Sequence, residues 1–320
     1  MKILLIPHNY KPFFNAGGET YLHNMVKALQ PYGHEFKAIV YAEQPYVYDG
    51  VECIPQGNLS TMWAAHSGLL NWCDLLITQL LGTAYAYNKA HQFKKPLVFI
   101  SHNQHRSYPI NEPSNKNTWI IYNSEYLKRE VNFTHPSFVL PPIIDYRNFT
   151  PAPASKRKYI TLVNCNENKG GKIFIKLAER MPEYQFLGIK GPKSYGEQFT
   201  AELPNLTYVD NREDITGYLS QTKVLVAPSE FETYGQAATE AICMGIPVVC
   251  SPTPGLKENL SHCGIYIDRN DVNLYTDILQ LLMSDSGYYS QQSARALKRA
   301  IELDPQPNVK SLNDWLLKIK

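Results

Sequence analysis

Short apolar runs rich in β-branched residues recur along the whole chain, and each is followed by a segment long enough for a helix. In the first half these runs are Ile3–Ile6, Phe36–Tyr41, Leu75–Ile77, Leu97–Ile100 and Trp119–Tyr122. In the second half they are Ile160–Val163, Tyr184–Ile189, Leu206–Val209, Val224–Ala227 and Pro247–Cys250. Strands that alternate with helices build parallel sheets from βαβ units, and the sheet is doubly wound when helices cover both faces. The sequence therefore predicts an α/β protein with doubly wound parallel sheets.

The chain is long enough for two domains, because 320 residues with 44% hydrophobic content exceed the usual size of one core. Four prolines fall between residues 140 and 158, among small and charged residues typical of a stiff, solvated connector. We therefore place the boundary near residues 150–156, between one Rossmann-like domain at 1–150 and a second at 151–305. Residues 306–320 form a terminal segment, in which an amphipathic helix would carry Leu312, Trp315, Leu316 and Ile319 on one face.

The charge balance does not call for a polyanionic partner, since 31 basic and 29 acidic side chains leave a net charge of +2. No two cysteines have the C-x-x-C spacing of a zinc or redox site, so we expect buried, reduced thiols in a cytoplasmic protein. These cysteines are Cys53, Cys73, Cys165, Cys243, Cys250 and Cys263. The longest lipid-like stretch, Leu75 to Tyr87, is well short of the roughly 20 residues of a membrane span. We expect a soluble protein without a transmembrane segment.

The most informative stretch runs from Val224 to Cys250 and has the pattern strand, polar loop, short helix, strand. Gly245, followed by a proline two residues later, indicates the end of the helix, and Gly235 marks its beginning. The first turn of this helix would offer unpaired N–H groups and the positive end of the helix dipole, which suits a phosphate group. The residues concerned are Tyr234, Gly235, Gln236 and Ala237.

Two carboxylates flank this helix start. Glu232 precedes it in the loop, and Glu240 lies just over one turn inside the helix. A loop that turns at Gly235 could aim both carboxylates at one ligand, one at each end.

This stretch resembles the retaining glycosyltransferases of family 4, which have the GT-B fold. The family pattern is Pro-Ser, Glu-x-x-Gly, Glu-Ala and small-Gly-x-Pro-Val-Val, with seven residues between the two glutamates. Its positions are filled by Pro228-Ser229, Glu232, Gly235, Glu240-Ala241 and Gly245-Ile246-Pro247-Val248-Val249. The resemblance implies two Rossmann-like domains facing each other across a cleft, with the helix of 306–320 crossing back to the N-terminal domain. It also implies that Glu240 holds ribose hydroxyls, that Glu232 lies beside the donor sugar, and that the backbone from Tyr234 to Ala237 meets the diphosphate.

Two segments of the first half resemble family elements as well. Gly17 and Gly18 follow the first predicted strand and correspond to a Gly-Gly loop that contacts the donor. His102 follows the strand Leu97–Ile100, where the family resemblance places a histidine near the donor sugar. Such a histidine could hydrogen-bond a sugar hydroxyl or the reacting phosphate, although His105 lies close by in the sequence.

In the second half, Lys169 matches the lysine of an Arg…Lys-Gly loop whose two cations neutralise the diphosphate in the family. The arginine position holds Asn164, which can donate hydrogen bonds but brings no positive charge. Either Lys169 and the helix terminus suffice, or another cation takes part. The candidates for that cation are Lys172, Lys190 and Arg106.

The resemblance implies a retaining glycosyltransferase that moves a sugar from a nucleotide-diphosphate donor to a hydroxyl acceptor. Glu232, His102 and Lys169 are the expected catalytic residues. The acceptor stays open among four hydroxylated classes: a glycan, a lipid-linked sugar, a small molecule or a modified DNA base. The family's chemistry needs no metal, and the sequence has no Asp-x-Asp motif, so we expect neither a metal nor a bound cofactor.

Three other functions fit parts of the pattern. One is a sugar-nucleotide 2-epimerase or a phosphorylase-like enzyme on the same architecture. Another is glycosylation of a hydroxylated base in DNA, which the short basic clusters permit but the balanced charge does not favour. The third is a binding protein that has lost catalysis, suggested by Asn164 at the arginine position.

Overall fold

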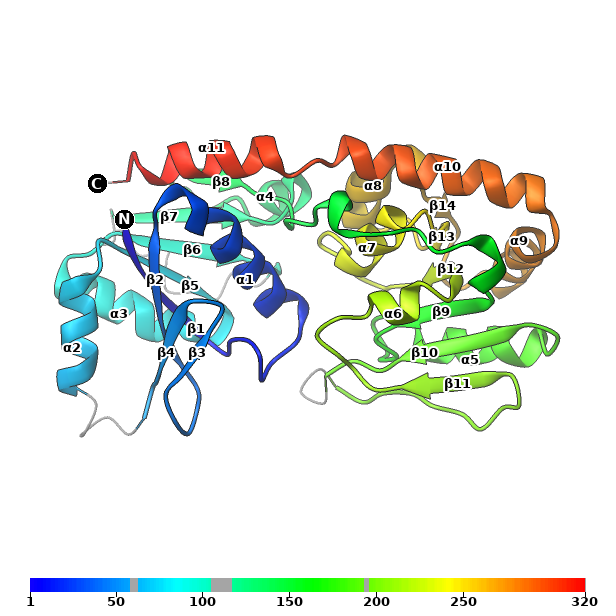
Figure 1. The fold of residues 1–320 in the computed structure, drawn as a ribbon, viewed down its shortest axis with the longest axis horizontal. Coiled ribbons are helices and arrows are strands. Elements are labelled where there is room, and N and C mark those ends of the chain that lie inside the picture. Colours follow the sequence, from blue (N-terminus) through cyan, green and yellow to red (C-terminus); the bar gives the residue numbers. More distant parts are fainter. Residues whose placement is uncertain (58–62, 105–116, 193–195, 320) are drawn as a thin grey trace. The chain divides into compact units, whose positions relative to one another are not determined.

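The computed structural model describes residues 1–57, 63–104, 117–192 and 196–319. The chain divides into two compact units, one of Met1–Ile143 with Pro305–Lys320 and the other of Ile144–Asp304. Each unit is a sheet covered by helices (Figure 1), so the predicted α/β fold is confirmed.

In the described part of the first unit, eight strands form one sheet in the order β3-β4-β2-β1-β5-β6-β7-β8. The strands are β1 Lys2–His8, β2 Glu35–Val40, β3 Tyr46–Tyr48, β4 Val51–Pro55, β5 Leu75–Gln79, β6 Leu97–Ser101, β7 Thr118–Tyr122 and β8 Ser137–Val139. The helices are α1 Gly17–Leu29, α2 Trp63–Trp72, α3 Thr83–Phe93, α4 Glu125–Val131 and α11 Gln306–Leu316, with the 3₁₀ turns η1 Gln30–Tyr32 and η2 Leu80–Gly82.

Successive residues of β1 point to opposite faces of this sheet, and each face has its own hydrophobic core. Ile3 and Leu5 belong to the core shared with α1 and α11, whereas Leu4 and Ile6 belong to the core shared with α2, α3 and α4. Helices therefore cover both faces, as the sequence predicted.

One edge of the first sheet differs from the prediction of purely parallel strands. β3 pairs antiparallel with β4, and the two-residue turn between them is Asp49-Gly50. Both turn residues have positive φ, 46° and 78°, which is the geometry that joins two antiparallel strands tightly. Neither strand was predicted, because the segment lacks the continuous apolar run by which the other strands were recognised.

The second unit has a six-stranded sheet in the order β11-β10-β9-β12-β13-β14, within the described residues, and all its pairs are parallel. The strands are β9 Tyr159–Val163, β10 Gln185–Ile189, β11 Leu206–Val209, β12 Thr222–Ala227, β13 Val248–Cys250 and β14 Ile265–Tyr266. The helices are α5 Gly171–Arg180, α6 Thr216–Leu219, α7 Gln236–Cys243, α8 Pro254–Leu260, α9 Val272–Ser284 and α10 Ser286–Glu302, with the 3₁₀ turns η4 Tyr146–Asn148, η5 Ala154–Lys156 and η7 Ser261–Cys263.

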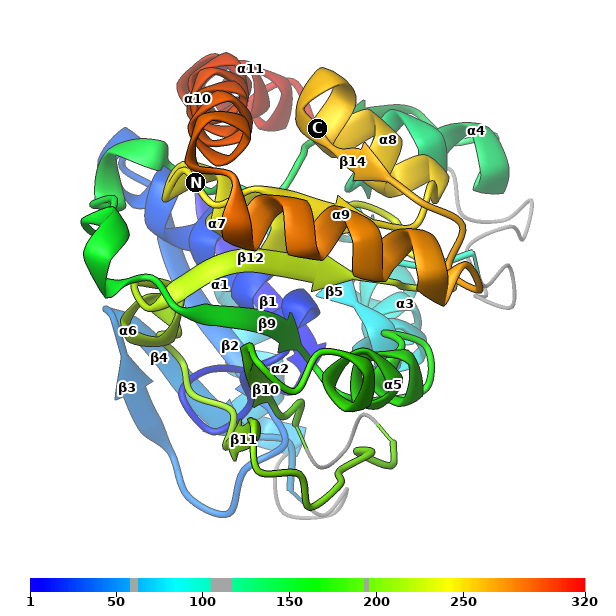
Figure 2. The same cartoon turned by 90° about the vertical axis from the view of Figure 1, so that its right-hand side faces the viewer.

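This sheet is also covered on both faces. Val224 and Val226 pack into the core formed with α5 and α9, which lie side by side in front of the strands in Figure 2. Leu225, between them in sequence, packs into the opposite core formed with α7, α8 and α10.

The strand order fixes where a ligand can bind in each unit. The chain steps outward from β9 through β10 to β11 and then returns to β12 on the other side of β9. The first unit has the same reversal between β1 and β5. Loops diverge at such a switch point, and open α/β sheets bind ligands beyond the carboxyl ends of the strands there.

The unit boundary lies earlier than predicted, since residues 144–150 belong to the second unit. Ile144 is buried in the core of α7 and α10, and Tyr146 and Phe149 pack against that core. Arg147 adds ion pairs to Asp145 and Asp304, both at 2.7 Å. The proline-rich connector was therefore a misleading boundary signal, because the apolar residues within it are anchored in the second core.

The C-terminal helix α11, red in Figure 1, packs in the first unit. Leu312 and Leu316 are fully buried beside α1, and His34 is joined to Asn313 by a hydrogen bond of 2.9 Å. In the part of the chain that the structure describes, no helix combines the length and apolar character needed to cross a bilayer.

We predict that Leu312→Ala lowers the free energy of unfolding of the first unit by about 2–5 kcal/mol, because it leaves a cavity in a closed core. Leu317→Ala is the matched control, since Leu317 lies just beyond the same helix and is 57% exposed. Urea denaturation followed by circular dichroism measures both. Equal effects of the two substitutions would show that α11 does not belong to that core.

Candidate functional site

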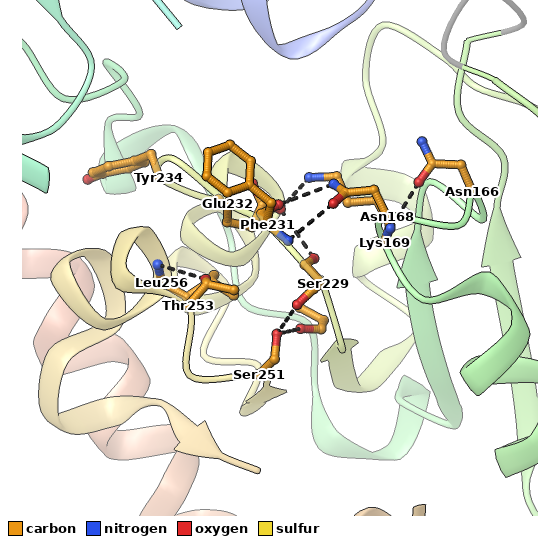
Figure 3. A network of polar contacts seen from close by, with 12 residues as sticks. Asn166, Asn168, Lys169, Ser229, Phe231, Glu232, Tyr234, Ser251, Thr253 and Leu256 are labelled. Atoms are coloured by element: carbon orange, nitrogen blue, oxygen red, sulfur yellow. Dashed lines mark hydrogen bonds and ion pairs between the residues drawn. The ribbon is translucent and has the colours of Figure 1, made fainter. Parts of the chain in front are cut away.

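Two loops meet at the switch point of the second unit and bring together opposite charges. Lys169 lies between β9 and α5, Glu232 lies between β12 and α7, and the lysine ammonium is ion-paired with Oε1 of the glutamate (Figure 3). Ser229 Oγ donates to the same oxygen at 3.4 Å. The side chains of Lys169 and Glu232 are 26% and 15% exposed, so a ligand can still reach both.

The two loops approach each other closely because glycines start α5. Gly170 has φ +86°, and a Cβ there would lie 2.6 Å from Cγ of Pro228. A Cβ at Gly171 would lie 2.1 Å from the carbonyl oxygen of Cys165. A side chain at Gly170 would push the Lys169 loop away from Pro228 of the Glu232 loop, whereas one at Gly171 would clash within the Lys169 loop itself.

The start of α7 has the geometry expected for an anion site. Gly235 caps the helix with φ +94°, and α7 begins at Gln236, followed by Ala237. Helix N-termini direct backbone N–H groups and the positive end of the dipole outward. Asn259 Nδ2 donates to the carbonyl oxygens of Tyr234 and Gly235, both at 3.1 Å, and so fixes the turn from behind.

Tyr234 can contribute only its backbone to this site. The residue is 4% exposed, and burial raises the pKa of the phenol above its ordinary value, so the group stays protonated. Glu240 lies on the second turn of α7 and is half-buried. Its assignment to the ribose stays a prediction.

Asn164 directly follows β9 and adopts a left-handed backbone conformation with φ 68°. Its side chain packs on Gly191, where an added Cβ would lie 2.3 Å from Oδ1. Among the described residues Oδ1 is buried without a hydrogen-bond partner. Asn164, at the position where the resembled family has arginine, is thus held against the end of β10 and supplies no charge.

The cations suggested as substitutes are engaged elsewhere or lie outside the described residues. Lys172 pairs with Glu167 at 2.8 Å, and Lys190 pairs with Asp210 at 3.1 Å. Arg106 falls in the segment 105–116, which the structure does not describe. Of the cations suggested from the sequence, Lys169 is the one that the described structure pairs with Glu232.

In the first unit, the predicted residues Gly18 and His102 meet at the switch point through Gln79. The Gln79 amide nitrogen donates to the carbonyl oxygen of Gly18 at 3.2 Å, and its oxygen lies 2.8 Å from Nε2 of His102. A carbonyl oxygen can only accept, so this orientation of the amide is required and Nε2 carries the proton. Gly17 is the first residue of α1.

His102 is uncharged at neutral pH, because burial lowers its pKa from 6.5 to about 4. Its ring also packs edge-on against Tyr21, with centroids 5.0 Å apart. Nδ1 keeps a lone pair, so the imidazole can accept a hydrogen bond from a hydroxyl. Sequence reasoning missed Gln79, whose polar side chain lies fully buried at the end of an apolar strand.

The predicted buried thiols are confirmed, since all six cysteines are buried and unpaired. Among the described residues no group of three or more His, Cys, Asp or Glu side chains could hold a metal ion.

Residues 158–285 match the family model described as Glycosyl transferases group 1. The chain is 36% identical over 96 residues to O-antigen chain mannosyltransferase B of Escherichia coli, which covers 30% of this chain and 25% of that protein. It is 26% identical over 175 residues to a D-inositol 3-phosphate glycosyltransferase of Arthrobacter sp., which covers 46% of this chain and 42% of that protein. The chain thus spans less than half the length of these curated relatives.

Solved structures resemble the whole chain at low sequence identity. A sucrose-phosphate synthase from Thermosynechococcus elongatus has a TM-score of 0.77 at 17% identity and covers 99% of this chain and 98% of its own. HepE of Anabaena, solved in complex with UDP-glucose, has a TM-score of 0.75 at 17% identity and covers 99% of both chains. At such identities the likeness shows the fold, which is that of the GT-B glycosyltransferases.

We predict that His102→Gln weakens the pH dependence of stability on the acid side. The unfolded chain binds a proton at this histidine near pH 6.5, whereas the native chain does so only near pH 4, so acid favours unfolding between these values. Through His102, the wild-type protein therefore loses about 2 kcal/mol of its free energy of unfolding between pH 7 and pH 5, and the variant does not. Urea unfolding of wild type and variant at both pH values tests this, and an identical pH dependence in the two proteins would refute it.

Proposed function

We propose that the chain is a glycosyltransferase that moves a sugar from a nucleotide-diphosphate donor to a hydroxyl acceptor. The observation that carries this proposal is the pair of Lys169 and Glu232 at the switch point of the second unit, in the same unit as the glycine-capped start of α7. The match to the group 1 family spans both loops, and the similar curated proteins include glycosyltransferases.

The reaction places negative charge where these groups lie. When the bond between the anomeric carbon and the diphosphate oxygen breaks, the leaving group gains negative charge. Lys169 and the N–H groups of α7 are fixed donors for that charge, which they stabilise more in the transition state than in the bound donor. The acceptor oxygen forms the new bond to the anomeric carbon, and its proton passes to a phosphate oxygen.

The two glutamates have separate roles in this proposal. Glu232 accepts hydrogen bonds from hydroxyls of the transferred sugar, and Glu240 accepts them from the ribose. The configuration at the anomeric carbon is retained, because the acceptor attacks from the face that the diphosphate leaves. No metal takes part, since the ammonium and the helix terminus supply the positive charge.

In the first unit, the residues that we assign to donor binding are neutral polar groups. Gly17 and Gly18 offer backbone at the start of α1, and the uncharged imidazole of His102 accepts a hydrogen bond from a sugar hydroxyl. A cytoplasmic location, inferred from the unpaired cysteines, stays part of the proposal.

A binding protein without transfer activity is the second candidate. The observation that favours it is Asn164, because the structure shows no substitute for the missing charge among the lysines suggested from the sequence. Binding and turnover must therefore be measured separately.

The proposal is tested by thermal-shift screening against UDP-, GDP-, ADP- and dTDP-linked sugars, followed by product analysis. Uridine donors come first, because HepE was solved with UDP-glucose. Transfer to an added hydroxylated acceptor supports the proposal. Donor isomerisation alone would identify an epimerase, binding without turnover would identify the second candidate, and salt-dependent DNA retention with base modification would identify a DNA glycosylating enzyme.

We predict that Lys169→Ala and Glu232→Ala each lower kcat about 100- to 1,000-fold, because each removes a preorganised contact at the reacting centre. Lys176→Ala and Glu179→Ala, exposed positions on α5, are the matched controls and leave kcat unchanged. Circular dichroism verifies that all four variants fold. Wild-type turnover in either site variant would contradict the assignment.

A further inference from the structure

We propose that Asn168 and Arg269 are positioning residues, which fix the separation of Lys169 and Glu232 by tying their two loops together. This inference deepens the proposed function, because it concerns the same site. Nothing in the family-like motifs marks either residue.

Asn168 binds both backbone polar groups of Phe231 with its side chain. Nδ2 donates to the Phe231 carbonyl oxygen at 3.1 Å, and Oδ1 accepts from the Phe231 N–H at 3.1 Å (Figure 3). The backbone of Asn168 adds a third bond, since its carbonyl oxygen accepts from the N–H of Glu230 at 2.7 Å. Lys169 follows Asn168 and Glu232 follows Phe231, so this pairing sets the register at which the two charges meet.

Neither aspartate nor alanine could replace Asn168 in this pairing. The pairing needs one donor and one acceptor at the end of a short side chain, and an ionised aspartate has no donor. Alanine provides neither group. Asn166 stabilises the same loop internally, because its Oδ1 accepts from the Lys169 N–H at 2.9 Å.

Arg269 connects the same two loops from the segment between β14 and α9. Nη1 lies 2.8 Å from Oε2 of Glu230, and Nη2 donates to the carbonyl oxygen of Glu167 at 3.2 Å. The guanidinium presents its N–H groups in a rigid plane, so it can hold both partners at once. The arginine side chain is only 21% exposed, whereas that of Glu230 is 65% exposed.

These ties matter because Lys169 and Glu232 lie on loops, where no strand pairing fixes their separation. A catalytic group displaced by about 1 Å can lose two orders of magnitude in rate. With Asn164 in place of a second cation, the leaving group depends on one ammonium, and its placement decides how well that charge is met.

The experiment uses the full chain with four variants: Asn168→Ala, Asn168→Asp, Arg269→Gln and Arg269→Lys. The controls are Asn273→Ala and Arg180→Gln, because Arg180 and Asn273 bond to each other between α5 and α9, outside the two loops. One readout is kcat and KM for the sugar nucleotide found by screening. The other is hydrogen exchange of the Glu230 and Phe231 amides, which needs no substrate.

We expect Asn168→Ala and Asn168→Asp to lower kcat about 10- to 100-fold with a smaller change in KM, and to speed exchange at Phe231. Arg269→Gln lowers kcat and speeds exchange at Glu230. Arg269→Lys keeps the positive charge and therefore retains more of kcat than Arg269→Gln. Both controls behave as wild type. Unchanged kcat and exchange in folded Asn168→Ala would overturn the role of Asn168, and the same result in Arg269→Gln would overturn that of Arg269.

If the wild-type protein turns over no sugar nucleotide, the proposed function is wrong. Hydrogen exchange still tests whether these residues tie the two loops together. In that case faster exchange at Phe231 in Asn168→Ala supports the tie between the loops, and unchanged exchange overturns it.

Discussion

The contact between Lys169 and Glu232 is the interaction on which the function proposed for the second unit depends. It exists because β9 and β12 are neighbouring strands at the point where the strand order reverses, so that the loops after them begin side by side at the carboxyl ends of the sheet. Gly170 then allows the first loop to approach Pro228 of the second loop. An ammonium and a carboxylate thereby come together in the unit whose α7 begins with a glycine cap.

This arrangement offers little positive charge to a diphosphate. Asn164 stands where the resembled family has arginine, and its amide packs against Gly191 with an oxygen that has no described partner. Lys172 and Lys190 are each paired with a carboxylate of their own. The donor's diphosphate would thus be met mainly by one lysine and by backbone dipoles, which makes the placement of that lysine important.

Much of the fold could be predicted from the sequence, because parallel strands that are buried on both faces appear as continuous apolar runs. The hairpin β3–β4 has no such run, and the local sequence feature that marks it is the Asp49-Gly50 turn. The site was predictable where local backbone chemistry defines it, as at Gly235. Asn168 and Gln79 were missed because their roles come from partners distant in sequence: Phe231 is 63 residues from Asn168, and Gly18 is 61 residues from Gln79. No local pattern encodes such a pairing.

The central claim is that a pyrophosphate-linked sugar binds at the carboxyl ends of β9 and β12. A crystal structure with the sugar nucleotide that gives the largest thermal shift tests this most directly. We expect diphosphate oxygens within hydrogen-bonding distance of Lys169 Nζ and of the backbone N–H groups that begin α7, with a sugar hydroxyl on Glu232. A diphosphate bound away from both loops would contradict it.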